Sequence, residues 1–370
     1  SLKEFDENSI NKMVQKIIEF LKASQKNNSY VTIPENKFKY PKIENSYDSK
    51  IKDCDPVEIV NTSINEALKN AKRTAGTFQS STGKVSILTS TGIEQEDKSS
   101  SLYLSLRAFA TKEASGHKTA TSSIFKKFNY EKAGEQAGEI AKQALNPEEG
   151  KSGEYDVVFS PLAFASILDN LGEASSIFSV ESGMSFLQEK LNENLGNFNL
   201  IDDGTLNNGV GSSKFDAEGH PTQRTEVIKD GVLKTYLHNT SSASRYKTKS
   251  TGNAGIISPS PTNLILEGKE GNPFNIDKGI YVSNVWYTRF QNYTTGDFST
   301  IPRDGMFMIK NGEIDKPIKN LRVSENVLNM LKNISLFGKD KEQITSWEAS
   351  IPCNLAPLLI KKVRMTKPTA

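Results

Sequence analysis

Six short turn signals between residues 202 and 312 constrain the fold of this chain more than any other feature. Each places a glycine among polar residues, at a position where a tight turn needs a positive φ angle. They are DDG at Asp202, AEG at Ala217, KDG at Lys229, TGD at Thr295, RDG at Arg303 and KNG at Lys310. The chain from Gly183 onward is therefore predicted to consist of short strands and turns, with one helix over residues 324–335.

In the first 150 residues, the segments at the beginning and at the end have apolar residues at helical spacing. Apolar residues recur every three or four positions over residues 9–23, 55–71 and 130–145, which predicts three amphipathic helices. Asp55 and Pro56 are a typical start for the second helix, because a capping side chain precedes a proline at the first helical position.

Between the second and third helices the hydrophobic period changes from helical to alternating. Residues 85–87 and 102–106 place apolar and polar side chains in turn, which predicts two antiparallel strands. The polar residues 90–101 are predicted to connect them, and residues 108–117 to form a further strand and turn.

A cluster of proline, glycine and charged residues at 146–155 marks the predicted domain boundary. After it, residues 156–160 are predicted to form a buried strand, and 161–171 an apolar helix. We therefore expect an α+β protein of two domains. Residues 1–150 would place helices on a mixed sheet, and residues 151–370 would form a strand-rich, antiparallel, barrel-like domain.

The composition excludes several classes of protein. Lys and Arg number 46 and Asp and Glu 44, so the net charge of +2 does not suit a strongly basic nucleic-acid binder. No stretch approaches the ~20 apolar residues that span a bilayer. The first residues do not follow the order of a signal peptide, and two isolated cysteines form no disulfide framework. The sequence thus indicates a soluble cytoplasmic protein that does not bind membranes or DNA directly.

The chain carries few of the residues and motifs that signal catalysis. None of its three histidines lies in an HExxH-type metal motif, and there is no CxxC pair, GxSxG elbow or phosphate-binding loop. We expect His238 to be structural or exposed and His220 to be solvated, while His117 has no evident partner. These motifs alone indicate a chain that is non-catalytic or that depends on another chain for catalysis.

Residues 201–255 contain an ordered set of motifs that resembles the TldD/PmbA family. They are DDGT at 202–205, FDAEG at 215–219, PTQRT at 221–225, GVLKTYL at 231–237 and TGN at 251–253. The resemblance covers residues 154–366 and extends more loosely to the N-terminal domain, where we expect the chain to begin near the family's first helix and to lack the strands that precede it.

The family has two branches, and the TldD branch binds zinc through an HExxxH helix and a cysteine near the C-terminus. At the matching positions this chain has Asp169, Asn170 and Ala174, and the matching stretch 336–344 contains no cysteine. One Asp cannot replace two imidazoles and a general base. The chain therefore resembles the PmbA/TldE branch, which implies no catalytic or metal-binding residue here and zinc in a TldD-like partner.

The resemblance implies a subunit of a cytoplasmic zinc metalloprotease that acts on unfolded peptides in proteolysis and peptide maturation. Its partner would be a TldD-like sister subunit or a second copy, and its ligand an extended peptide. The family label "modulator of DNA gyrase" gains no support from the balanced charge. One alternative is a self-associating peptide-binding protein. Another is an autonomous hydrolase with a metal held by Asp169, Asp202 or Asp216 together with His238.

Four acidic residues of the shared block, Asp202, Asp203, Asp216 and Glu218, lie within 17 residues. They form either a site for a cation or an amine or, as we favour, the side-chain hydrogen bonds of tight turns. Arg224 either holds a peptide carboxylate or pairs with Glu218 or Asp216.

Thr251 and Asn253 lie in a polar, glycine-containing loop of the same block. Backbone N–H groups in such a loop can bind an extended peptide by strand addition, and the residues are therefore candidates for peptide binding. The alternative is that they simply end a loop.

Overall fold

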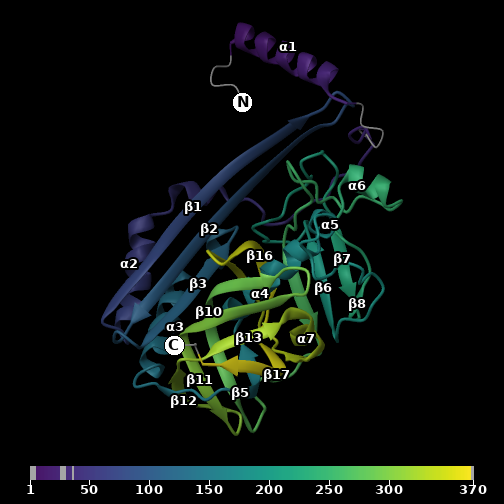
Figure 1. The fold of residues 1–370 in the computed structure, drawn as a ribbon. Helices are drawn as coiled ribbons and strands as arrows, with labels where there is room; N and C mark the ends of the chain where they lie inside the picture. Colours follow the sequence, from purple (N-terminus) through teal and green to yellow (C-terminus); the bar gives the residue numbers. More distant parts are fainter. Residues whose placement is uncertain (1–5, 26–30, 36, 368–370) are drawn as a thin grey trace.

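The computed structural model describes residues 6–25, 31–35 and 37–367. Its first half is a three-stranded sheet covered by helices, and its second half contains a ring of five strands and a six-stranded sheet (Figure 1). The expected α+β class and the barrel-like second half are confirmed. No helix in the described ranges is long and apolar enough to cross a bilayer.

The sheet of the first half consists of β1 (Arg73–Leu88), β2 (Glu94–Phe109) and β3 (Ser115–Ser122). Both pairings are antiparallel, so the prediction of a mixed sheet was wrong. Residues 90–101 were predicted to be a connection, yet most of them belong to β2. The outer part of β2 has no continuous buried face, and therefore its sequence does not alternate between apolar and polar.

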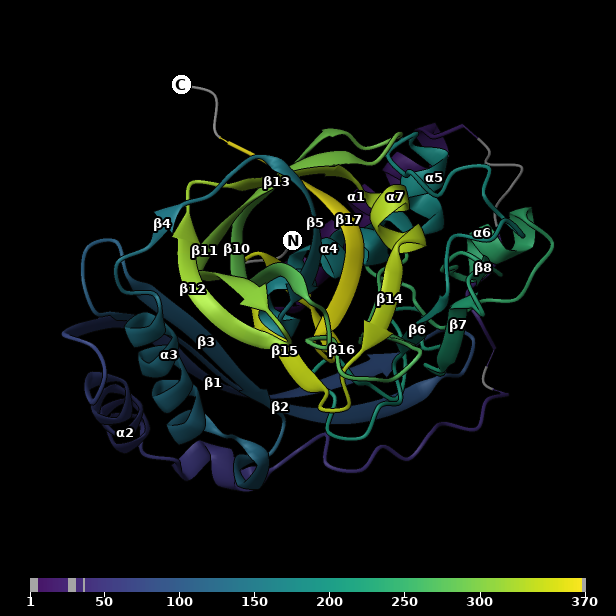
Figure 2. The same ribbon diagram turned by 90° about the horizontal axis from the view of Figure 1, so that it is seen from below.

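The two faces of this sheet differ in polarity because the side chains of a strand alternate. Leu102, Leu104 and Leu106 are almost fully buried on the face that α2 (Pro56–Leu68) and α3 (Tyr130–Gln143) cover. The opposite face carries hydroxyl, amide and phenol groups and is turned toward the second half of the chain (Figure 2). Its side chains are Thr77, Gln79, Ser101, Tyr103, Ser105 and Thr121.

The helices α2 and α3 approach each other closely at glycines of α3. A Cβ atom at Gly134 would lie 2.2 Å from the backbone oxygen of Ser63, and one at Gly138 would lie 2.6 Å from that of Ala67. Both helices were predicted, and Asp55 caps α2 by accepting hydrogen bonds from the Val57 and Glu58 amides.

The first predicted helix is confirmed as α1 (Glu7–Ala23), but it buries none of its residues. Asp6 caps it by accepting a hydrogen bond from the Ser9 amide. Its apolar stripe is exposed, with Ile17 at 50% and Phe20 at 72% of full exposure. The helix lies apart from the rest of the molecule, beyond the tip of the β1–β2 hairpin (Figure 1).

Five strands of the second half close into a ring, which Figure 2 views from one end. They are β5 (Gly153–Phe159), β10 (Lys278–Asn292), β11 (Asp297–Lys310), β13 (Arg322–Asn326) and β17 (Leu358–Thr366). The order around the ring is β10-β5-β17-β13-β11, and β11 pairs with β10 to close it. Only the β5–β10 pairing in this ring is parallel. Three short strands extend it: β4 (Glu148–Glu149), β12 (Glu313–Lys319) and β14 (Ile334–Phe337).

The second sheet of this half has the order β15-β16-β9-β6-β7-β8. Its strands are β6 (Phe198–Asp203), β7 (Arg224–Lys229), β8 (Val232–Leu233), β9 (Leu264–Gly268), β15 (Glu342–Ser346) and β16 (Ala349–Leu355). The apolar helix α4 (Pro161–Ala174) is capped by Ser160 and packs against both β10 of the ring and β16 of this sheet. The remaining helices are short: η1 (Ser49–Asp53), η2 (Phe125–Lys127), α5 (Ile177–Glu181), α6 (Thr240–Arg245) and α7 (Val327–Lys332).

Three sequence expectations need correction in this half. Gly204 of DDG does not have a positive φ angle, although the other five glycines do. The RDG signal is not a turn: Gly305 lies inside β11, where an extra residue bulges opposite β10. The helix expected over 324–335 is limited to α7, because the residues at its two ends belong to β13 and β14. The domain break after residue 150 stays a prediction, since β4, which precedes it, pairs with β12.

Candidate functional site

The helix α4 carries Asp169 and Asn170, the two residues that the motif resemblance aligns with the histidine and glutamate of the zinc branch. The Asp169 carboxylate accepts a hydrogen bond of 2.8 Å from the Ile351 amide of β16, and burial raises the pKa of Asp169 to about 6. The Asn170 side-chain amide donates to the backbone oxygen of Ser166, 2.7 Å away in the same helix. The Asp169 side chain therefore ties α4 to β16, whereas the Asn170 side chain is bonded within the helix itself.

The residues around α4 do not fit a zinc ion. Cys353 is fully buried against the helix, and burial, with the nearby Asp169, raises the pKa of its thiol, whereas zinc binds a thiolate. Phe337, in the stretch where the zinc branch has its cysteine, is a core residue. Within the ranges that the structure describes, no three His, Cys, Asp or Glu residues lie together as a metal site would require. The set Asp169, Asp202, Asp216 and His238 is thus not brought together.

The acidic residues of the shared block accept hydrogen bonds from neighbouring loops. Asp202 is fully buried, receives hydrogen bonds of 2.6 Å from the Thr262 amide and from the Asn253 side chain, and has its pKa raised to about 6 by burial. Asp203 receives bonds from the amide and hydroxyl of Thr205. The Asp203 contacts are those that the turn interpretation predicts, whereas the Asp202 carboxylate joins distant loops.

Asp216 organises a second loop in the same way. One of its oxygens accepts from the amides of Glu218 and His220, and the other accepts from the Ala254 amide at 3.0 Å. Burial raises the pKa of Asp216. Glu218 in turn accepts from the Thr240 amide at 3.0 Å. The two carboxylates therefore connect three loops of the second half.

Arg224 pairs with a different acid from those expected. Its guanidinium lies 3.3 Å from Asp203 and 4.0 Å from Glu267, and the prediction of a pair with Glu218 or Asp216 was wrong. The antiparallel register of β6 and β7 places Arg224 directly opposite Asp203, which spacing along the sequence does not reveal. About half of the Arg224 side chain is exposed.

Thr251 and Asn253 are buried and hold loops together. Thr251 exchanges hydrogen bonds with the backbone of His238, and the Asn253 amide group donates to Asp202 and to the Ser260 oxygen. His238 is buried against Tyr246, in agreement with a structural role. Their burial leaves neither Thr251 nor Asn253 facing a peptide, so a role in binding stays a prediction.

His220 is only half-buried, and its ring packs against Phe38 at a centroid distance of 4.8 Å rather than being fully solvated. Its Nδ1 lies 2.9 Å from the backbone oxygen of Pro221. The Phe38 contact comes from a connection 182 positions earlier in the chain, and local sequence could not indicate it.

His117 has partners that the sequence did not reveal. Its Nε2 lies 2.8 Å from the Ser105 hydroxyl, and its Nδ1 accepts from the Asn284 side chain at 2.9 Å. Asn284 donates its other amide hydrogen to Asp304, so the His117 proton is on Nε2 and points at Ser105. A histidine in this tautomer cannot remove the serine proton, and the arrangement is not a hydrolase triad.

A groove runs between the polar face of the first sheet and the second half of the chain. One part, of about 570 Å³, is lined by residues 85–87 and 97–99 of the hairpin and by loops at 210–217 and Ala254. The other part, of about 530 Å³, lies between the polar face of β1–β3 and the β15–β16 hairpin, including Trp347. Val210 lines both parts, and we call them together the hairpin groove.

The hairpin groove has polar walls and borders the outer strand of the first sheet. Its walls offer many hydroxyl and amide groups, and β1 pairs only with β2 in the described part of the chain. An unpaired strand edge presents backbone N–H and C=O groups to which a peptide can add. Asp216 is the only residue among the sequence candidates that contributes to its lining.

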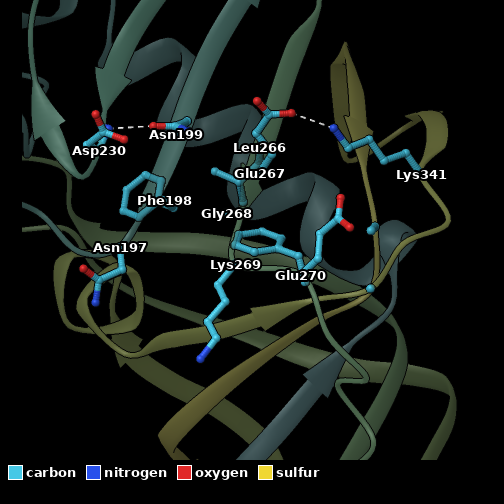
Figure 3. Close-up of a pocket in the computed structure, with 13 residues that line it drawn as sticks. Asn197, Phe198, Asn199, Asp230, Leu266, Glu267, Gly268, Lys269, Glu270 and Lys341 are labelled. Atoms are coloured by element: carbon cyan, nitrogen blue, oxygen red, sulfur yellow. Dashed lines mark hydrogen bonds and ion pairs between the residues drawn. The ribbon is translucent and has the colours of Figure 1, made fainter.

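A separate pocket of about 590 Å³ lies beside β6, β9 and β14 (Figure 3). Two polar contacts define its rim: the Asp230 amide donates to Asn199 at 2.6 Å, and Lys341 pairs with Glu267 at 2.6 Å. None of the candidates from the sequence lines this pocket.

Family comparisons agree with the motifs and the fold. The model of the PmbA/TldA metallopeptidase central domain matches residues 43–145, and that of the C-terminal domain matches residues 152–367. The uncharacterized protein MJ0231 of Methanocaldococcus jannaschii is 29% identical over 344 residues, 89% of this chain and 78% of that protein. The metalloprotease PmbA homolog of Haemophilus influenzae is 28% identical over 216 residues, 56% of this chain and 46% of that protein.

Solved structures share the fold at low sequence identity. The chain TM0727 of Thermotoga maritima, described as a modulator of a DNA gyrase, has a TM-score of 0.87 at 23% identity and covers 96% of this chain and 83% of its own. TldE of Thermococcus kodakarensis has a TM-score of 0.85 at 20% identity, with 99% and 86% covered. The chain spans about half or less of the relatives that carry metalloprotease names. On the two matching family models, the chain belongs to the PmbA/TldA metallopeptidase family, the TldD/PmbA family that its motifs resemble.

Proposed function

We propose that this chain is the PmbA/TldE-like, non-catalytic subunit of a two-chain cytoplasmic metalloprotease that acts on unfolded peptides. The proposal rests on the hydrogen bonds of two residues of α4. Asp169 accepts a hydrogen bond from β16 and Asn170 donates one to the backbone of α4 itself, and the motif resemblance aligns them with a ligand and a general base of the zinc branch. In this proposal zinc and the reacting water belong to a TldD-like partner.

The hairpin groove supports the second part of the proposal, the binding of an extended peptide. Thr77 and Gln79 line it from β1, whose outer edge is unpaired in the described residues. Backbone pairing along this edge requires no particular side chains in the peptide, which suits a protease subunit that handles unfolded chains in proteolysis or peptide maturation.

A groove-blocking substitution tests the role in peptide binding. Thr77→Trp places a large side chain in the groove, whereas Ser80→Trp on the same strand points to the opposite face of the sheet and is the matched control. We expect Thr77→Trp to weaken binding of a fluorescent unfolded peptide at least tenfold and Ser80→Trp to leave it unchanged. Equal binding by both variants would show that the peptide lies elsewhere.

One alternative is a peptide-binding protein that associates with itself and takes no part in catalysis. All residues that line the hairpin groove belong to one chain, which favours this peptide-binding protein over an autonomous hydrolase. Purification of the two chains distinguishes these proposals. Co-purification with a TldD-like chain would support the protease subunit. A stable homodimer that does not bind such a chain would support the peptide-binding protein.

A further inference from the structure

The turn between β15 and β16 places a half-exposed tryptophan in the lining of the hairpin groove. Ser346 and Ala349 pair across this hairpin, so Trp347 and Glu348 form its turn. Trp347 lines the part of the groove that faces β1–β3, and 53% of the residue is exposed. Tryptophan is an unusual residue for a two-residue turn, where Asn, Asp and Gly predominate.

Trp347 belongs to a rigid group of aromatic rings. Its ring packs edge-to-face against Trp286 at a centroid distance of 5.0 Å and against Tyr287 at 6.0 Å. We call these three residues the aromatic cluster. The Glu348 carboxylate accepts a hydrogen bond of 2.9 Å from the Thr288 amide, which ties the turn to β10. Because its ring is held in place, Trp347 loses little conformational entropy when a ligand contacts it.

The backbone of Tyr287 is strained where it supports the aromatic cluster. Its φ angle is +58°, in the left-handed region that a bulky residue seldom adopts, and it lies where the pairing of β10 with β11 is irregular. Such a conformation is destabilising and occurs most often at functional sites. Tyr287 is 46% exposed, so burial of its ring does not account for the strain.

The groove beside Trp347 is closed on one side and open on the other. On the β3 side, the hydroxyl oxygens of Thr121 and Thr345 lie 2.9 Å apart and join the sheet to β15. On the opposite side lies β1, which pairs only with β2 in the described part of the chain. Tyr103 of β2 lines the floor, because its register partners are Gln79 on β1 and Thr121 on β3. A peptide that adds to β1 therefore enters the hollow that Tyr103 and Trp347 line.

The period of a strand decides which peptide residues face the aromatic rings. Successive side chains of a strand point to opposite faces of the sheet, so every second residue of a peptide paired with β1 faces the groove, as Thr77 and Gln79 do. Residues on the same face are about 7 Å apart. One side chain of the peptide therefore lies closest to Trp347.

The charges around the aromatic cluster favour a neutral ring over a cation as the ligand. The guanidinium of Arg107 lies 4.6 Å and that of Arg303 lies 5.2 Å from the centre of the Trp286 ring. Arg303 is exposed and has no ion-pair partner among the residues that the structure describes. A Lys or Arg of the peptide would meet like charge there, whereas an aromatic ring gains from ring–ring contacts beyond the area it buries.

We propose that Trp347 and Tyr103 form a subsite for one aromatic side chain of the bound peptide, with Trp286 and Tyr287 holding Trp347 in place. This inference rests on the proposed function and adds a substrate class to it, namely unfolded peptides with Phe, Tyr or Trp at a position that faces the groove.

The test compares four labelled unfolded peptides that differ only at one central residue, which is Phe, Leu, Arg or Glu. Their binding to the full chain is measured by fluorescence anisotropy. We expect the Phe peptide to bind about threefold tighter than the Leu peptide and about tenfold tighter than the two charged ones, because only Phe makes ring–ring contacts. Tightest binding of the Arg or the Glu peptide would overturn the subsite.

Variants of Trp347 assign the preference to its ring. Trp347→Ala should abolish the preference for Phe. The matched control is Phe178→Ala, which removes a ring that is 48% exposed and lines neither part of the groove, and it should retain the preference. Trp347→Leu keeps an apolar side chain against Trp286, so the melting temperature should change little while the Phe and Leu peptides become equal in affinity.

The fluorescence of Trp347 gives a second readout that does not depend on affinity. The chain has two tryptophans, so in Trp286→Phe the emission comes from Trp347 alone. Saturation with the unlabelled Phe peptide should shift this emission to shorter wavelength, because the ring loses contact with water. An unchanged emission would overturn the subsite.

The remaining outcomes separate the subsite from the proposed function. Equal affinity of the native chain for the Phe and Leu peptides would overturn the subsite and leave the proposed function intact. Binding of none of the four peptides would overturn both. An equal loss of preference in Trp347→Ala and Phe178→Ala would show that the ring of Trp347 has no special part, and would also overturn the subsite.

Discussion

Asp304 accepts three of the side-chain hydrogen bonds that join the two halves of the chain, and a fourth from its own half. It lies on the bulge of β11, its side chain is fully buried, and it accepts bonds from Arg107 at 2.6 and 2.9 Å, from Ser115 at 2.7 Å and from Asn284 at 3.1 Å. The Arg107 guanidinium also lies 4.6 Å from the centre of the Trp286 ring.

Removing the Asp304 carboxylate should destabilise the folded chain. In Asp304→Ala the Arg107 charge, which is only 23% exposed, loses its partner, and we expect the free energy of unfolding to fall by about 3 kcal/mol. Glu226→Ala is the control, because it breaks the exposed pair with Lys229 and should cost less than about 0.5 kcal/mol. Urea titrations measure both, and equal costs would contradict the assignment of Asp304 as the joining residue.

His117 should make stability depend on pH. Burial lowers its pKa from 6.5 to about 4, so acid protonates the imidazole in the unfolded chain first and favours unfolding. The stabilisation is complete above pH 6.5 and is lost progressively as the pH falls toward 4. Between pH 7.5 and pH 5 the loss amounts to about 2 kcal/mol.

Asp169 and Asp202 act in the opposite sense, because their pKa values are raised to about 6 and acid stabilises the folded form through them. The contribution of His117 must therefore be measured as a difference in unfolding free energy between two proteins. The gap in unfolding free energy between the native chain and His117→Gln should narrow by about 2 kcal/mol from pH 7.5 to pH 5. A constant gap would show that His117 does not titrate as described.

The contacts of a single residue could be predicted where its partner lies nearby in the sequence. They could not be predicted where the partner is distant in the sequence. The turn contacts of Asp203 and Asp216 connect residues two to four positions apart and follow from their motifs. The partners of Arg224 and His117 depend on strand register and on contacts up to 167 positions apart. No short-range pattern encodes such contacts.

At the scale of elements, two amphipathic helices with similar patterns have different environments. Ile59 in α2 is 2% exposed and packs beneath the first sheet, whereas Ile17 in α1 is 50% exposed. Ile59→Ala should lower the free energy of unfolding by about 2–5 kcal/mol, and Ile17→Ala by no more than about 0.5 kcal/mol. A comparable loss from Ile17→Ala in the isolated chain would mean that α1 packs against the body.

The elements that were predicted well have one continuous buried face. This holds for α2 and α3 and for the leucines of the inner half of β2. The outer half of the β1–β2 hairpin has no such face, and the helix expected over 324–335 was shortened because ladder pairing of β13 and β14 outweighs local helical preference. Tertiary pairing decides these cases, and a single sequence does not show it.

At the scale of the whole molecule, the hairpin groove exists only because the polar face of the first sheet is turned toward the β15–β16 hairpin and the 210–217 loops. The motifs predicted the family. They did not predict the groove, since its two walls come from segments 89 or more positions apart, each of which resembles an ordinary solvated surface.

The central claim is that this chain supports proteolysis only together with a zinc-bearing partner. The most direct measurement is cleavage of a fluorogenic unfolded peptide by the chain alone, by a TldD-like sister alone, and by the co-purified pair with and without a chelator. We expect full activity only for the pair, and its loss on chelation. Chelator-sensitive cleavage by this chain alone, or a pair no more active than the sister, would contradict it.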